Sequence, residues 1–487
     1  MTRTLTTSTT DRRKLLTSGL AAGLLAASGL SIASTPRVGG RLRAALPGAK
    51  ASDTWDARLG FGLFMQAIGQ GAVFDCLTEV SADGSLRGEL ATNWEASRDA
   101  RKWVFDLRKG VRFHNGAVFD SASVVETLRM HMQAGPSGAA WSVVSNIESV
   151  RAIGPHQVQF SLHTGNADFP YLLSDRHLIL YPAGQIAEAM RDGIGTGLFR
   201  VAVFEPGERF VGWRMADHYK DGNAGWFDQI EILAAENPED RLALLTSGRV
   251  DVIGQVDPSH AAAVDASSDL KLASTPGNQH ISLDLPNEGA FADETTRQAF
   301  RFAVDRNAAL FDGVHGYGQP GFDSPIGPFN QNFGWSQPDF DPKHAATLLQ
   351  NVGPVGLQIE TQSAVPLSFA SSIWPSLLAV GFVQSTASKV TARMSSGRVT
   401  EDWALQSMQL DPGSEQLRRQ AMATFDSSHR SELYTQIQRD LRQSSRVVIP
   451  VFTNFLHAVS NRLAQPGTLG NVWPLDNARF AERWWFS

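Results

Sequence analysis

Residues able to do covalent or metal chemistry are present, but they do not form a known catalytic pattern. The twelve histidines are scattered, and no two have the three- or four-residue spacing that puts two metal ligands on one helix face. No GxSxG, HExxH, CxxC or GxxxxGK[S/T] motif occurs. The acidic residues leave a catalytic carboxylate pair open, although no spacing singles one out. We therefore predict a protein that is not an enzyme, without metal or cofactor.

Composition and cysteine content bound the class of protein. The chain has 487 residues, a formal net charge of −6 and 42% hydrophobic residues, which suits one or two sizeable globular lobes. Mild acidity and the lack of a basic run interleaved with aromatics argue against a nucleic-acid partner. The single cysteine, Cys76, cannot form an internal disulfide and is expected to be a small buried residue.

The stretch from residue 88 to 132 has the pattern of a strand, a turn and a helix. Residues 103–107 alternate apolar and polar side chains, which is typical of a half-buried strand. Asn115-Gly116 predicts a turn, because both residues tolerate positive φ. Asp120 can cap a following helix, whose buried stripe would include Val124 and Leu128.

The same stretch resembles a known family. ELATNWEAS at 89–97 and WVFDLRKGVRFHNGAVFDSASVV at 103–125 are similar to the signature of the family 5 extracellular solute-binding proteins, the peptide, opine and nickel receptors of ATP-driven importers. Residues 39–46 resemble the family's first strand, and 194–200 its GTGPY turn, where we expect the glycines to supply unusual dihedrals. Residues 291–306 resemble a second hallmark helix, on which Arg297 and Arg301 predict a solvated or salt-bridged face.

The N-terminus is expected to be a targeting segment. Residues 10–16 resemble the twin-arginine export motif, and a moderately apolar stretch follows, so we assign 1–34 as a signal peptide. A membrane anchor is the alternative, but a spanning helix usually needs about 20 strongly apolar residues. No cysteine lies nearby, which argues against a lipid-modified N-terminus. These features predict a periplasmic protein.

The resemblance implies an α/β fold of two lobes with a cleft between them, the class C type of periplasmic binding protein, which carries an extra subdomain in its first lobe. We expect the first lobe at 38–282, with the inserted subdomain at about 75–195. The second lobe is expected at 283–462, and a C-terminal segment, 463–487, at the first lobe again. Such a receptor is expected to be a monomer that delivers its cargo to a membrane permease.

Candidate ligand contacts follow from position in the family pattern, on the loop after the first strand and on a second-lobe segment. They are Thr54, Trp55, Asp56, Arg398, Asp402, Trp403 and Asp411. By this resemblance, Asp411 or Asp402 would bind a ligand amine, Arg398 would bind a carboxylate, and Trp55 and Trp403 would form stacking walls. The alternatives are solvated loop residues for the charges and core residues for the tryptophans.

The predicted function is capture of a di- or oligopeptide, or a similar small solute, by lobe closure for an ABC importer. An opine, glycoside or nickel-chelate receptor of the same family is the first alternative. An exported hydrolase or a sensor built on the same fold is the second.

Overall fold

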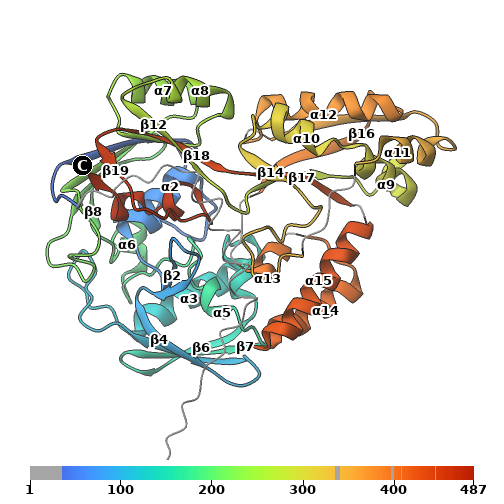
Figure 1. Cartoon of the computed structure of the whole chain (residues 1–487). Coiled ribbons are helices and arrows are strands. Elements are labelled where there is room, and N and C mark those ends of the chain that lie inside the picture. The colour runs from blue at the N-terminus through green and yellow to red at the C-terminus, as the bar shows by residue number, and fades with distance from the viewer. Residues whose placement is uncertain (1–35, 335–339, 363, 396–399, 407, 445) are drawn as a thin grey trace, which may run out of the picture.

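Two lobes lie side by side in the structure, which is a computed structural model describing residues 36–334, 340–362, 364–395, 400–406, 408–444 and 446–487. The first lobe is built from the N-terminal half and the C-terminal end of the chain, and the second lobe from the segment between them (Figure 1). Each lobe contains its own sheet and its own buried cluster. The expected α/β fold of two lobes is confirmed.

The first lobe centres on a seven-stranded sheet. Its central strand, β1, pairs in parallel with β10 and β11, and four of its six residues are buried. Burial on both faces explains why this strand is apolar and lacks polar alternation. In sheet order the strands are β12 (Leu270–Thr275), β18 (Phe455–Ser460), β11 (Val252–Gly254), β1 (Arg41–Leu46), β10 (Gln229–Ala234), β9 (Arg209–Arg214) and β8 (Phe199–Glu205).

A second sheet forms the subdomain inserted in this lobe. It consists of β4 (Ala91–Ala96), β5 (Lys102–Leu107), β7 (Gln157–Leu162) and β6 (Ile147–Gly154), with the small hairpin of β2 (Thr78–Val80) and β3 (Leu86–Gly88) beside it. The predicted strand is β5, and the predicted helix is α3 (Ser121–Ala134), whose free N–H groups Asp120 caps through Ala122 and Ser123. Both predictions are confirmed.

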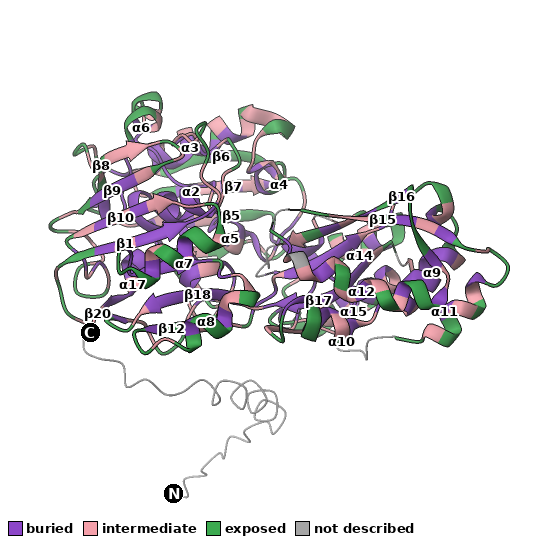
Figure 2. Ribbon diagram, turned by 90° about the horizontal axis from the view of Figure 1, so that it is seen from above, coloured by how far each residue is buried: buried purple, intermediate pink, exposed green. Residues whose placement is uncertain are grey.

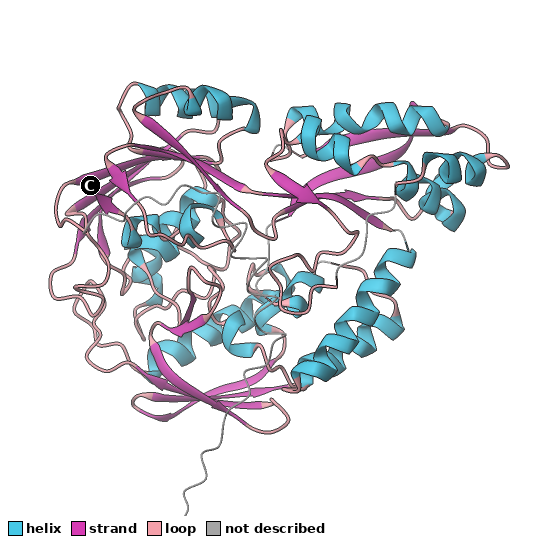
Figure 3. Ribbon diagram, viewed as in Figure 1, coloured by secondary structure: helices cyan, strands magenta, loops and turns pink. Residues whose placement is uncertain are grey.

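The second lobe is a five-stranded sheet with helices. Its strands are, in order, β14 (Gly318–Pro320), β17 (Val447–Thr453), β13 (His280–Asp284), β16 (Phe382–Ser395) and β15 (Val355–Thr361). Its helices are α9 (Glu294–Ala303), α10 (Arg306–Ala308), α11 (Pro342–Leu349), α12 (Leu367–Val380), α13 (Glu401–Leu405), α14 (Pro412–Ala423) and α15 (Ser427–Ser444). Figure 3 shows α14 and α15 as a hairpin that reaches from this lobe toward the four-stranded sheet.

The chain passes between the lobes at two adjacent points, 276–279 and 453–455. Strand β13 starts at His280, and β18 already belongs to the first-lobe sheet. The predicted second-lobe bounds, 283–462, are therefore a few residues too late, because strand pairing and not the end of a motif decides lobe membership. Thr453 N–H donates to Gln279 O at 2.8 Å, which joins the two crossings.

The remaining first-lobe elements surround the seven-stranded sheet. They are α2 (Leu63–Ile68), α4 (Trp141–Val144), α5 (Phe169–Leu172), α6 (Ile186–Asp192), α7 (Pro238–Thr246), α8 (Ala261–Asp265), β19 (Leu463–Ala464), α16 (Pro474–Asn477), α17 (Phe480–Arg483) and β20 (Trp485–Phe486). The C-terminal aromatics are docked, since Phe480 and Trp484 lie in the first-lobe core. Figure 2 shows buried residues concentrated in the sheets of both lobes.

The glycines of the turn at 194–200 serve close packing, which corrects our expectation about their dihedrals. Neither Gly195 nor Gly197 has positive φ. A Cβ on Gly195 would lie 2.0 Å from the carbonyl oxygen of Val73, and one on Gly197 would lie 2.3 Å from that of Ala72. The turn is thus pressed against the backbone that follows α2, and His114 N–H donates to Gly195 O at 2.9 Å.

Substituting Gly195→Ala should destabilise the protein by about 1–3 kcal/mol, because backbone must move to admit the methyl group. Gly60→Ala is the matched control, since nothing lies within 4 Å of its added Cβ. Urea unfolding at neutral pH measures both. Equal unfolding midpoints for the two variants would contradict this packing role.

Two buried histidines should make the protein sensitive to acid. Burial lowers the pKa of His131 to about 4 and that of His457 to about 3. Folded, both stay neutral below pH 6.5, whereas in the unfolded chain they take up protons there, so stability falls as pH drops from 6.5 toward 4. Each should cost about 2 kcal/mol at pH 5. Unfolding free energies at pH 7 and pH 5 should differ less in the double variant H131Q/H457Q, and an unchanged difference would refute the assignment.

Candidate functional site

A pocket of about 320 Å³ lies between the two lobes, and both contribute to its walls. From the first lobe come the β2–β3 turn, the start of α5 and the segment 471–472. From the second lobe come the loop at 329–331, the start of α13 and one residue of α15. The lining residues are Asp83, Gly84, Ser85, Asp168, Tyr171, Asn471, Val472, Asn278, Phe329, Gln331, Thr400, Glu401 and Arg430.

An ion pair joins the lobes at this pocket. The guanidinium of Arg430, on α15, donates to the carboxylate of Asp168, just before α5, and both side chains are nearly nine-tenths buried. Burial opposes the charge of Arg430, but the carboxylate of Asp168 prevails and raises its pKa. A cation and an anion thus face each other where a solute would enter.

Glu401 adds a second carboxyl group to the same wall. It is the first residue of α13, whose N-terminus Thr400 caps by accepting from Trp403 N–H at 3.3 Å. One Glu401 oxygen accepts from Asn332 N–H at 2.8 Å, and burial raises the pKa of the carboxyl group. Phe329 is 46% exposed beside it and offers an apolar face.

Further contacts hold the lobes together around the pocket. The rings of Trp403 and Trp473 lie 6.1 Å apart, and Trp403 is part of the first-lobe core although α13 belongs to the second lobe. Ala167 N–H donates to Met422 O at 2.7 Å, and Phe425 packs edge-on against Trp103. The α14–α15 hairpin therefore touches the inserted subdomain.

The structure places the first three predicted site residues away from this pocket. Trp55 is buried, with its ring 4.5 Å from that of Phe204, and its carbonyl oxygen accepts from Tyr181 O–H. Asp56 pairs with Arg58 at 2.6 Å. Although burial alone would raise the pKa of Asp56, its bonds to Arg58 lower it. Thr54 lies next to them and is half-buried.

The second-lobe predictions lie closer to the pocket. Asp402 and Trp403 adjoin the pocket residue Glu401 in the first turn of α13. Asp402 is fully buried and bound to Arg418, and burial raises its pKa. Asp411 caps α14 through the N–H groups of residues 413 and 414. Arg398 lies outside the described residues.

Sequence reasoning missed the residues that line the pocket. Glu401 is one position from predicted Asp402, so the segment was found but not the side chain. Asp168 and Arg430 are 262 residues apart and share no motif or spacing. Only the tertiary fold brings them together.

One group of closely spaced carboxylates could hold a metal within the described part of the chain. Asp75, Glu89 and Glu482 are buried, with oxygens within 4.8 Å of one another. The ammonium group of Lys220 lies 2.7–2.8 Å from an oxygen of each. The protein's own cation thus sits where a metal ion would bind.

Comparison with known proteins decides the family. The model of the bacterial extracellular solute-binding proteins, family 5, matches residues 85–366. The chain belongs to this family. The match covers more than half of the chain and includes the inserted subdomain.

Relatives of this family-5 protein bind varied cargo. It is 23% identical over 325 residues to the nickel-binding periplasmic protein of Escherichia coli K12, a match that covers 62% of this chain and 60% of that one. It is 24% identical over 320 residues to the glutathione-binding protein GsiB of Salmonella paratyphi A, covering 64% and 59%. The chain thus spans about 60% of the length of the curated relatives it matches.

Solved structures share the fold over nearly the whole described chain. The periplasmic binding protein AgaA of A. tumefaciens R10, in complex with agropinic acid, has a TM-score of 0.80 at 21% identity and covers 92% of this chain and 99% of that one. The periplasmic binding protein DppA of Helicobacter pylori, in complex with a peptide, has a TM-score of 0.78 at 18% identity and covers 92% and 99%. This family-5 chain has no helix, among its described residues, that is long and apolar enough to span a membrane.

Proposed function

We propose that this protein is the solute receptor of an ABC importer and captures a di- or oligopeptide, or a similar small amphoteric solute, between its lobes. The observation that carries the proposal is the interlobe pocket, in which opposite lobes supply the opposite charges of Asp168 and Arg430. Family membership and the ligands named for relatives support it.

The chemistry of the pocket suits a solute with both an amine and a carboxylate. Arg430 can present a guanidinium to a ligand carboxylate, and Asp168 and Glu401 can accept from an ammonium group. Asp402 or Asp411 for the amine, Arg398 for the carboxylate, and Trp55 and Trp403 as walls remain our predictions from the family pattern. Because each lobe holds part of the site, ligand contacts favour the arrangement with the lobes together.

The alternatives differ in cargo or in outcome. An opine, a glycoside or a nickel chelate would use the same pocket, in keeping with the agropinic acid and nickel named for relatives. A hydrolase or sensor on this fold is the remaining alternative. We propose a binding protein without catalytic activity, exported to the periplasm by residues 1–34, monomeric, and docking on a membrane permease.

Native mass spectrometry of the protein purified from its own host tests this function. We expect a bound compound of a few hundred daltons that is released only on denaturation and recovered unchanged. A thermal-shift screen of dipeptides, opines and nickel chelates then identifies the class. Conversion of the released compound on incubation with the protein would overturn the proposal, as would a screen in which no compound raises the unfolding temperature.

A further inference from the structure

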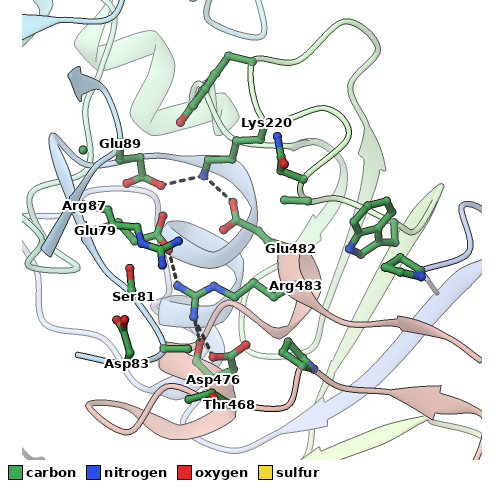
Figure 4. Close-up of a pocket in the computed structure, with 18 of the residues that line it drawn as sticks. Glu79, Ser81, Asp83, Arg87, Glu89, Lys220, Thr468, Asp476, Glu482 and Arg483 are labelled. Atoms are coloured by element: carbon green, nitrogen blue, oxygen red, sulfur yellow. Dashed lines mark hydrogen bonds and ion pairs between the residues drawn. The ribbon is translucent and has the colours of Figure 1, made fainter. Parts of the chain in front are cut away.

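A second cavity lies wholly within the first lobe. It has a volume of about 790 Å³, and its walls are the β2–β3 hairpin, the loop at 219–226 and the C-terminal segment 466–485 (Figure 4). It shares only Asp83, at the hairpin turn, with the interlobe pocket. Second-lobe residues do not line it, so lobe movement would leave its described walls intact.

The floor of this cavity is a set of ion pairs that already satisfy one another. Lys220 binds Glu89 and Glu482 at 2.8 Å, and Arg483 binds Asp476 Oδ1 at 2.8 Å and also Glu79 (Figure 4). These groups fix the shape of the floor. They are not available to anchor a ligand.

Two arginines on the cavity wall remain without an ion pair among the described residues. Arg108 donates from Nε to Glu89 O at 2.9 Å, and its guanidinium stacks over the Tyr219 ring, 4.9 Å from the ring centre. These two contacts hold the guanidinium in place and leave its terminal N–H groups free within the described chain. Arg87 is exposed at the rim. A fixed guanidinium with free N–H groups is a binding site for a carboxylate.

Three polar atoms of cavity-lining residues are buried and have no hydrogen-bond partner in the described chain. They are Ser81 Oγ, Tyr219 O–H and Asp476 Oδ2. Ser81 and Asp476 are more than nine-tenths buried. Leaving such groups unpaired costs about 1–3 kcal/mol each, so a partner that supplies hydroxyl groups would be favoured. Trp226 and Trp485 add aromatic surface to the same walls.

We propose that this cavity binds a polyhydroxylated carboxylate of sugar-acid size. Arg108 takes the carboxylate, and Ser81, Tyr219 and Asp476 take the hydroxyl groups. A neutral sugar would leave the Arg108 fork unpaired, and a simple inorganic anion would leave the three buried polar atoms unpaired. The volume lies within the usual range for small-molecule sites. This site is separate from the interlobe pocket.

Gluconate is the probe, measured by saturation-transfer difference NMR on the purified protein, with glucose as the neutral comparison. We expect saturable gluconate binding that is at least tenfold tighter than glucose binding. Arg108→Gln should weaken it at least tenfold, and Arg98→Gln, an exposed residue away from the cavity, should not change it. Thr468→Trp, at the exposed rim, should block entry without disturbing the floor.

Arg430→Gln separates the two sites, because it removes the interlobe cation and should leave gluconate binding intact. The proposal is overturned if wild type shows no saturable gluconate signal, or if folded Arg108→Gln and Thr468→Trp both bind as wild type does. It is also overturned if Arg430→Gln alone abolishes binding, since gluconate would then occupy the interlobe pocket. Should Arg108→Gln fail to fold, Thr468→Trp alone decides between binding and no binding in the cavity.

Discussion

Replacing Arg479 with methionine should lower the free energy of unfolding by about 3–5 kcal/mol, the usual cost of removing one partner of a buried ion pair. Arg479 is 2% exposed and lies 2.7 Å from Glu89 and 2.8 Å from Glu482. Glu89 and Glu482 are themselves buried, so without the guanidinium two carboxylates would face each other with Lys220 as their remaining cation. Urea unfolding at pH 7 measures the loss.

Arg191→Met is the control for this prediction. Arg191 also pairs with a neighbouring carboxylate, Asp192, but both are exposed, so its removal should leave the unfolding midpoint within error of wild type. If Arg479→Met were as stable as Arg191→Met, the ion network would not hold the C-terminal segment to the first lobe as we infer.

Replacing Arg430 with glutamine should abolish most of the affinity for whichever amphoteric ligand the screen identifies. Truncating one partner of a buried, hydrogen-bonded charge pair at an interface costs about 2–5 kcal/mol, which corresponds to a loss of roughly thirtyfold or more. The loss has two sources: the carboxylate anchor disappears, and Asp168 is left unpaired between the lobes. Isothermal titration with the identified ligand gives the ratio of dissociation constants.

Arg439→Gln is the matched control, since Arg439 is an exposed arginine on the same helix, α15. It should bind the ligand as wild type does. Unchanged affinity in Arg430→Gln would remove this ion pair from the binding site. It would favour a ligand position on the first-lobe loop at 54–56 that the family pattern predicts.

The local elements were predictable because their signals are local. The alternation at 103–107, the Asn-Gly turn and the Asp120 cap each act within a few residues, and the strand and helix form where those signals stand. The family resemblance extended this to the two-lobed fold. Lobe boundaries were less accurate, because membership of β18 depends on pairing with strands about 200 residues earlier.

The candidate site was only partly predictable for the same reason. Arg297 and Arg301 illustrate the limit: one turn apart, they predicted a solvated or salt-bridged face. Instead Arg297 is buried and donates to the carbonyl oxygens of Phe291 and Ser444. A charge pattern on one helix does not reveal what packs against it. Asp168 and Arg430 escaped prediction because no local signal links them.

The placement of β18 has a consequence for biosynthesis. This strand lies between β11 and β12 in the first-lobe sheet, and α17 behind it supplies Phe480 and Trp484 to the same core. A ribosome must therefore finish almost the entire polypeptide before the half it made first can reach its final form. Until then the early strands would have an unfilled edge, and a truncated product lacking the last 35 residues would be a target for proteases instead of a stable fragment.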